Sequence, residues 1–260
     1  YNSLFKLGFG FVEAGTITPL EQYGNPKPRV FRLEEDEALI NRLGFNNLGA
    51  KNINSRIRSN LPTGLLGINI GPNKDSENRL NDYLINFRLF HDIAGYITIN
   101  ISSPNTENLR NFHESEKLDE LLNLIDEEKK NLKSKTPLVV KISPDILDEE
   151  ALQISNILLK YDVKAIIVSN TTEKNRDKLK NISRNEKGGL SGKPLETRSN
   201  QLINIFYNLL KDKIIIIGVG GVDSGISAFN KFSAGASFLQ LYTGMVYQGP
   251  NIVIKIKKEL

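Results

Sequence analysis

The feature that most constrains the fold is an alternation of short apolar runs with amphipathic segments along 260 residues. Seven runs have the length and composition of buried strands, and most segments between them have helical spacing. The predicted strands are residues 9–16, 65–70, 96–101, 137–142, 165–168, 214–219 and 237–241. This alternation favours an α/β fold, and at this length a (β/α)8 TIM barrel over an open sheet.

The segments between the strands predict helices, and seven strands are one short of a closed barrel. The expected helices are residues 36–43, 76–90, 117–133, 148–160, 195–211 and 224–232. The chain starts at Tyr1 rather than Met, so we expect the first barrel strand to precede it. We therefore expect one catalytic barrel domain over residues 1–260, incomplete at its N-terminus and slightly short at its C-terminus.

Composition excludes several kinds of site. The chain has no cysteine, which rules out disulfides, thiolate metal sites and a cysteine nucleophile. Its two histidines, His91 and His113, are too few to favour a zinc site or a histidine-based triad, so we expect no metal. No apolar run approaches the roughly 18–20 residues of a membrane span. The formal charge is +4, but the lysines and arginines are scattered among acidic residues, so we expect no nucleic-acid partner.

Polar or glycine residues stand at the end of nearly every predicted strand. In a parallel barrel these ends converge on one face, where the chemistry of such folds is carried out. They are Thr16, Asn69, Asn100, Lys141, Ser169-Asn170, Gly220-Gly221 and Tyr242-Thr243. The convergence predicts a single site at that face.

The loop at residues 100–110 carries the strongest local pattern, NISSPNTENLR. The amides of Asn100 and Asn105 each donate and accept hydrogen bonds, which suits a flat ring with alternating C=O and N–H groups. Ser103 between them is the one plausible proton acceptor in the loop. The alternative interpretation is a serine-rich turn.

Glycines after the last two strands suit a phosphate. Residues 218–221 read GVGG, and Tyr242-Thr243-Gly244 follows the final strand. Barrels often bind phosphate with these loops, and Gly192 can line the same pocket; the alternative is a tight turn. Lys141 lies near the end of the otherwise apolar run VVKI, where its ammonium would stabilise negative charge on a bound cofactor or would reach the rim.

The loop at residues 100–110 resembles the N-x-S-S-P-N-T-x-x-L-R signature of the quinone-linked, class 2 dihydroorotate dehydrogenases. Nine further blocks look like the same family: residues 15–19, 25–32, 41–46, 69–74, 141–145, 169–172, 188–194, 218–222 and 241–243. The likeness covers nearly the whole chain. The given sequence lacks two segments of the family: the first barrel strand, which carries a G-F-D-K-N-like motif, and the N-terminal membrane-associating helices.

The resemblance implies an FMN-dependent barrel that oxidises dihydroorotate to orotate in pyrimidine biosynthesis. FMN would be held by Thr16, Asn69, Asn100, Lys141, Ser169, Gly192, Gly221, Tyr242 and Thr243. The substrate would be held by Asn41, Arg42, Leu43, Gly44, Phe45, Asn100, Asn105, Asn170 and Thr171. Ser103 would be the base, taking a proton from C5 while a hydride leaves C6 for N5 of FMN.

Ser103 also bears on the electron acceptor, because soluble relatives use cysteine there. Serine implies a membrane quinone, with Arg32, Tyr242 and Val246 toward its passage and residues 103–116 as a lid. The resemblance implies a peripheral protein of the bacterial inner membrane's cytoplasmic face, or of the mitochondrial inner membrane in a eukaryote. The alternatives are another FMN-dependent pyrimidine oxidoreductase and a non-catalytic barrel fragment.

Overall fold

The structure is a computed structural model that describes residues 1–106 and 108–260. Its central element is a parallel sheet of seven strands in the order β1-β4-β5-β6-β7-β9-β10. The strands are β1 (Phe11–Ile17), β4 (Leu65–Ile70), β5 (Tyr96–Asn100), β6 (Leu138–Lys141), β7 (Val163–Val168), β9 (Ile215–Val219) and β10 (Phe238–Gln240). The seven predicted strands are therefore confirmed as one parallel, curled sheet.

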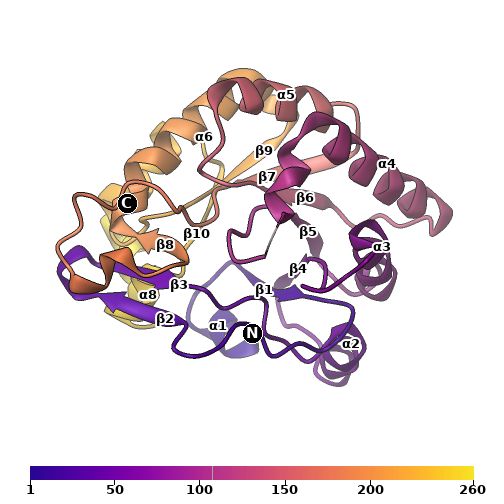
Figure 1. Cartoon of the computed structure of the whole chain (residues 1–260), viewed down its shortest axis with the longest axis horizontal. Helices are drawn as coiled ribbons and strands as arrows, with labels where there is room; N and C mark the ends of the chain where they lie inside the picture. Colours follow the sequence, from indigo (N-terminus) through magenta and orange to yellow (C-terminus); the bar gives the residue numbers. More distant parts are fainter. Residues whose placement is uncertain (107) are drawn as a thin grey trace.

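Helices connect the strands and cover the outer face of the sheet (Figure 1). They are α2 (Ala50–Ser59), α3 (Arg79–Phe90), α4 (Ser115–Asn131), α5 (Asp148–Leu158), α6 (Glu196–Leu210) and α7 (Gly225–Ser233). Shorter helices are α1 (Asn2–Lys6), α8 (Thr243–Gln248) and α9 (Ile252–Glu259). Short 3-10 helices are η1 (Glu34–Asp36), η2 (Leu109–His113), η3 (Ile182–Asn185), η4 (Lys193–Leu195) and η5 (Lys211–Lys213).

Strand periodicity divides the side chains between two layers. On β5, Ile97 and Ile99 belong to the large cluster between the sheet and the helices. Tyr96 belongs to a separate cluster on the inner side of the sheet, and Thr98 and Asn100 make inward contacts with other strands. Successive side chains on a strand point to opposite faces, so residues 97 and 99 face the helices while residues 96, 98 and 100 face the inside of the curl.

The bottom of the curl is filled by aromatic rings. Tyr96 lies over Gly67, where an added Cβ would come within 2.1 Å of its ring. Phe11 packs edge-on against Tyr96 and against Phe238, with 6.2 Å between centroids in each pair. Phe11 lies on one edge strand, β1, and Phe238 on the other, β10. The sheet therefore curls far enough to bring its edges into side-chain contact.

A second, antiparallel sheet corrects one predicted helix. The sequence predicted a helix over residues 36–43, but β3 (Ala38–Asn41) lies between β2 (Val30–Leu33) and β8 (Gly189–Gly192). Only η1 precedes it. Ala38, Leu39 and Ile40 are all buried, because β3 is the central strand of this sheet. Its sequence therefore lacks the alternation of apolar and polar residues that usually indicates a strand. The prediction was wrong because β8 is remote in sequence.

Two helix starts also differ from expectation. The helix expected from Ser76 begins at Arg79, and Asn78 is its cap, accepting a hydrogen bond from the Asn81 N–H. Asp148, expected as a cap, is instead the first residue of α5, and Leu147 holds the cap position. In both cases several polar residues precede the helix, and local propensity does not choose among them.

Lys231 on α7 is fully buried without a carboxylate within 4.0 Å among the described residues. Its ammonium donates to Ser199 Oγ and to Asn200 Oδ1, each at 2.9 Å. Burial lowers the pKa of Lys231 from 10.5 to about 8, and the charge of Glu196 opposes part of that change. Ser199 in turn donates to the Val219 carbonyl at 2.7 Å, so this buried lysine supports the end of β9 from behind.

We expect Lys231 to make stability rise with pH above about 8. The unfolded chain keeps this proton up to pH 10.5, whereas the folded protein releases it near pH 8, so alkali favours folding in that window. Relative to Lys231→Met, the wild-type free energy of unfolding should increase by about 3 kcal/mol across it. Urea denaturation at several pH values measures this; a difference that does not change with pH would contradict it.

Candidate active site

A cavity of about 790 Å³ opens among the carboxyl ends of the parallel strands and the inner face of the curl. Many of the predicted site residues line it, from both the cofactor and the substrate sets. They are Thr16, Asn41, Leu43, Gly44, Phe45, Asn69, Asn100, Ser103, Asn105, Lys141, Asn170, Thr171 and Tyr242. The volume is in the range of about 300–1,000 Å³ that small-molecule and cofactor sites occupy.

Glu13 on β1 is the acidic group of the cavity wall. Asn69 Nδ2 donates to its Oε1 at 2.8 Å. Its Oε2 accepts from Thr98 Oγ1 at 2.8 Å, Gln240 Nε2 at 3.1 Å and Tyr96 OH at 3.2 Å. Burial, followed by the charge of Glu13, raises the pKa of Tyr96, so its phenol remains a donor. These four contacts join strands β1, β4, β5 and β10.

A row of side-chain hydrogen bonds continues from Asn69 toward β5. Asn69 Oδ1 accepts from Thr16 Oγ1 at 2.7 Å and from Asn100 Nδ2 at 3.2 Å. Asn100 Nδ2 also donates to Thr16 Oγ1 at 2.8 Å, which uses its second hydrogen. The two amides and the threonine therefore hold one another in fixed orientations.

The row ends on the loop after β7. Asn100 Oδ1 accepts from Ser102 Oγ at 2.9 Å and from the Ser102 N–H at 3.2 Å. Asn170 Nδ2 donates to Ser102 Oγ at 2.9 Å, and Asn170 Oδ1 accepts from the Thr171 N–H at 2.8 Å. One continuous row thus crosses the cavity from Glu13 to Asn170.

Ser103 lies on the cavity wall with 5% of its surface exposed. Its Oγ accepts from the Asn105 N–H at 3.2 Å. The Asn105 side chain donates to the Asn41 carbonyl at 3.0 Å. These contacts bring the loop after β5 against the end of β3, so the small sheet forms one wall of the site.

Arg110 ties three strand-end loops together. Its guanidinium donates to Asp145 Oδ2 at 2.9 Å, to the Thr171 carbonyl at 3.1 Å and to the Ser102 carbonyl at 3.3 Å. Asp145 follows β6, Thr171 follows β7 and Ser102 follows β5. A planar guanidinium with several fixed donors suits such a junction.

His113 attaches the same loop to β6. Its Nδ1 donates to the Arg110 carbonyl at 2.8 Å, and its Nε2 accepts from the Ser143 N–H at 3.1 Å. A backbone N–H can only donate, so Nε2 is unprotonated and the ring is neutral. Burial is the main reason that the pKa of His113 falls from 6.5 to about 4.

Lys141 and Phe45 provide the charge and the flat surface of the cavity. The Lys141 ammonium has no hydrogen-bond or carboxylate partner within the described residues, although its side chain lines the cavity. Phe45 packs close to Gly71, where an added Cβ would lie 3.2 Å from its ring. A cation and an aromatic edge on one cavity suit an anionic or electron-rich flat ligand.

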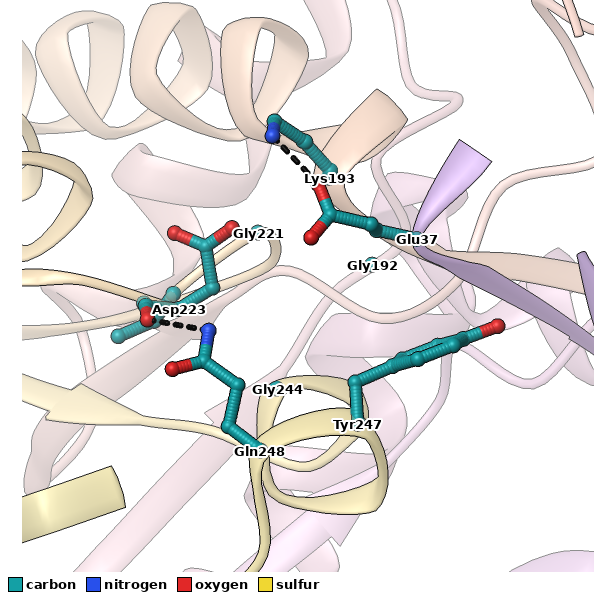
Figure 2. Close-up of a pocket in the computed structure, with 9 residues that line it drawn as sticks. Glu37, Gly192, Lys193, Gly221, Asp223, Gly244, Tyr247 and Gln248 are labelled. Carbon is teal, nitrogen blue, oxygen red and sulfur yellow. Dashed lines mark hydrogen bonds and ion pairs between the residues drawn. The ribbon is translucent and has the colours of Figure 1, made fainter. Parts of the chain in front are cut away.

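The glycine-rich end forms a smaller cavity, drawn in Figure 2. Gly192 and Gly221 line it, with the Glu37–Lys193 ion pair at its rim. Both glycines have positive φ, 97° and 75°, and an added Cβ would lie 2.4 Å from the Glu37 carbonyl and 2.6 Å from Glu196 Cβ respectively. Only glycine fits either position.

Unused backbone donors gather at this end. The N–H groups of Gly221, Val222, Thr243 and Gly244 have no hydrogen-bond acceptor among residues 1–106 and 108–260. They come from the segments that follow β9 and β10, which are neighbouring strands. Such groups are suited to an anion such as a phosphate.

Two predicted residues face elsewhere. Arg42 pairs with Glu186 at 2.8 Å and lies over the Phe31 ring at 4.6 Å, outside the large cavity. Ser169 is buried, and its Oγ donates to the Asn170 carbonyl at 3.3 Å.

Thr243 shares a 2.8 Å hydrogen bond with Ser191 near the glycine-rich end. Glu107 of the predicted lid lies outside the described residues.

The sequence reasoning missed Glu13, Ser102, Arg110 and Asp145. Glu13 had a usable signal, because it is the one charged residue of an otherwise apolar strand run, as Lys141 is of its own run. Arg110 stood within the recognised loop pattern but received no role. Asp145 stood within the recognised block 141–145 but received no role, since its partners are remote in sequence.

Comparisons with known proteins agree with this geometry. The family model for dihydroorotate dehydrogenase matches residues 1–260. A relative from Buchnera aphidicola subsp. Schizaphis graminum, named dihydroorotate dehydrogenase (quinone), is 46% identical over 265 residues, covering 100% of this chain and 79% of its own length. A relative of the same name from Bartonella tribocorum is 46% identical over 263 residues, covering 100% and 73%.

Solved structures give the same result. A crystal structure of DHODH from Eimeria tenella in complex with ferulenol matches with a TM-score of 0.95 at 36% identity, over 98% of this chain and 75% of that one. The ligand-free structure matches with a TM-score of 0.94 at 37% identity, over 99% and 78%. The fold is therefore the TIM-barrel architecture that the alternation predicted, and the chain belongs to the dihydroorotate dehydrogenase family of oxidoreductases.

Proposed function

We propose that this protein oxidises dihydroorotate to orotate in pyrimidine biosynthesis, with FMN as hydride acceptor and a membrane quinone as final electron acceptor. The observation that carries the proposal is the meeting of Ser103, Lys141 and Asn170 on one cavity, in a chain of the dihydroorotate dehydrogenase family. The names of the relatives, dihydroorotate dehydrogenase (quinone), support the choice of acceptor.

The residues present fit FMN at both ends. The large cavity has the volume for a flavin ring and a substrate together, within the range of about 300–1,000 Å³ for such sites. The unused N–H groups at Gly221 and Thr243 suit its phosphate, and Gly192 and Tyr242 lie beside them. Thr16, Asn69, Asn100 and Lys141 would hold the ring, with Ser169 and Thr243 behind them.

FMN would supply the acceptor for the hydride that leaves C6 of dihydroorotate. Lys141 is placed to favour negative charge on a ring in the cavity, because its ammonium has no competing partner among the described residues. Charge interactions are stronger in a site that excludes water than in bulk solvent, so one free ammonium has a large effect there.

Ser103 is the group that we assign as base toward C5 of the substrate. Its hydroxyl is a weak base, so it requires a site without bulk water, and its 5% exposure supports that condition. The Asn105 N–H already donates to its oxygen at 3.2 Å, which fixes its position on the wall. On taking the C5 proton the hydroxyl would pass its own proton to a water molecule, because no acceptor of this hydrogen is recorded among the described residues.

The substrate would lie among amides. Asn41 and Asn105 are joined at 3.0 Å on one wall, and Asn100 and Asn170 belong to the row on the floor. Residues 43–45 and Thr171 complete the lining. Amides present both donors and acceptors, which matches a ring carrying alternating C=O and N–H groups. Arg42 would act from outside the cavity, by holding residues 186 and 187.

The quinone would approach from the side of Tyr242, whose side chain is 64% exposed and also lines the large cavity. Arg32 on β2 is exposed, and Val246 on α8 is one turn from Tyr242. Among the described residues no helix has the length and hydropathy to cross a membrane. The proposal places the protein peripherally at the cytoplasmic face of a bacterial inner membrane, or at the mitochondrial inner membrane in a eukaryote.

We expect dihydroorotate to bleach the bound flavin, because the amide walls match its ring and its carboxylate suits a basic protein. Purified protein saturated with FMN should lose flavin absorbance on anaerobic addition of dihydroorotate and regain it with a soluble quinone. Dihydrouracil is the matched control, since it lacks the carboxylate. Reduction by dihydrouracil and not by dihydroorotate would favour the alternative pyrimidine oxidoreductase, and binding of FMN without reduction by either would favour a non-catalytic fragment.

We expect Ser103→Ala to slow flavin reduction by about 10²–10⁴-fold, the usual contribution of a positioned acid or base. Binding of FMN should not change, because Ser103 contacts the substrate side of the cavity. Ser103→Cys is the matched control: a thiol of ordinary pKa near 8.5 should restore part of the rate, with the pH profile moved to lower pH. Stopped-flow absorbance measures each rate; wild-type turnover in Ser103→Ala would remove Ser103 as the base.

We expect acid to destabilise the protein through His113. The unfolded chain takes up a proton at pH 6.5, whereas the folded protein resists until about pH 4, so acidification in that window favours unfolding. The glutamine of His113→Gln stays neutral in this pH window. The free energy of unfolding of this variant should therefore fall less on acidification than that of wild type, by up to about 3 kcal/mol. Urea denaturation between the two values measures it, with His91→Gln as the control for losing a histidine; identical curves for wild type and His113→Gln would refute it.

A further inference from the structure

Glu13 has no part in the reaction as proposed, yet it sits on the inner face of the curl with four donors and no cation. Among the described residues no lysine or arginine lies within 4.0 Å of its carboxylate. Its partners come from β4, β5 and β10. Burying a carboxylate without a cation is costly unless its oxygen lone pairs accept hydrogen bonds, and these four donors meet that condition.

An ionised carboxylate can only accept hydrogen bonds, and this property fixes Asn69. The Asn69 NH₂ group must face Glu13, so its Oδ1 must face Thr16 and Asn100. Asn100 points its NH₂ group toward β4 and its Oδ1 toward Ser102, an orientation that the Ser102 backbone N–H, which can only donate, also requires. An amide without such a neighbour could turn over with little change in shape.

Backbone donors fix the far end of the row. Ser102 uses its hydroxyl proton on Asn100 Oδ1, so its oxygen is left to accept from Asn170 Nδ2. Asn170 Oδ1 is in turn taken by the Thr171 N–H. Every donor in the row thus points back toward Glu13. Each of the Asn69 and Asn170 NH₂ groups retains one hydrogen without a recorded partner in the described chain.

We propose that Glu13 is a positioning residue that fixes the orientation of the Asn69 amide, so that Asn69 Oδ1 accepts from Thr16 and Asn100 and the remaining Asn69 N–H is presented to the flavin. This inference deepens the proposed function and depends on it for the identity of the ligands. Donors on the floor, together with the Lys141 ammonium, which has no partner in the described part of the chain, suit ring carbonyls and ring negative charge. Glu13 acts through the row and not by contact with the substrate.

A charge-relocation experiment separates this role from packing. Glu13→Gln keeps the shape but adds an NH₂ group, so Asn69 is free to turn. Asn69→Asp places two carboxylates together. In E13Q/N69D the introduced glutamine donates to the introduced carboxylate, whose other oxygen still accepts from Thr16 and Asn100, which restores the direction of the remaining row. Packing alone predicts no such rescue, because the three variants have nearly the same volume.

Two measurements are made on wild type and on the three variants of the full chain. The first is the FMN dissociation constant, from quenching of flavin fluorescence. We expect E13Q to weaken binding about tenfold, N69D to weaken it further, and the double variant to bind FMN better than N69D but less well than wild type, because the introduced carboxylate has no N–H for the flavin. The second is the NMR spectrum of the side-chain NH₂ groups of Asn100 and Asn170 without flavin. The Asn100 signals should shift in E13Q, because Asn69 Oδ1 then no longer faces them, and return in E13Q/N69D, whereas the Asn170 signals, whose amide the Thr171 N–H fixes, serve as the control.

The outcomes distinguish the two proposals. Wild-type protein that binds no FMN would defeat the proposed cofactor, and the positioning role would then be judged on the NH₂ resonances alone. Unmoved Asn100 resonances in E13Q would overturn the positioning role whether or not FMN binds. So would a double variant whose loss equals the sum of the two single losses.

Discussion

Pairing of the Glu13 carboxylate inside the curled sheet is the constraint on which the site depends. The interior excludes water, and a carboxylate left there without partners would cost several kcal/mol, on the order of 2–7 even for a neutral polar group. Glu13 meets this constraint with donors from three other strands. The strand register is therefore part of the site, because a slip of one residue would turn Asn69 outward and leave Glu13 exposed to an apolar layer.

Rigid strands and a tethered loop share the work of the proposed reaction. The amides and Lys141 lie at strand ends that the sheet holds in place. Strand ends are well suited to groups that must be preorganised for the reaction. Ser103 lies on the loop after β5, whose far end is held by Arg110 and His113. A base on a loop fixed at both ends can be covered or exposed without disturbing the floor.

The sequence predicted the strands and their polar ends because both depend on local information. An apolar run of strand length is visible in a short window, and the residue that follows it is at the sheet edge by construction. Helix starts such as Asn78 shifted by a few residues, since several neighbouring polar residues can cap. The strand β3 was mistaken for a helix because its second partner, β8, lies about 150 residues away in the chain and local propensity is weak against such pairing.

The sequence by itself determined the α/β alternation, the absence of metal-binding thiolates and the set of polar groups at the strand ends. Only the tertiary structure decided which of those groups meet, that Arg42 turns to Glu186, and that Glu13, Arg110 and Asp145 belong to the site. The physical reason is that periodicity fixes the face on which a side chain lies, whereas its hydrogen-bond partners come from strands that are distant in sequence. The orientation of each amide is likewise set by partners that can only accept or only donate, such as the Glu13 carboxylate and the Ser102 backbone N–H.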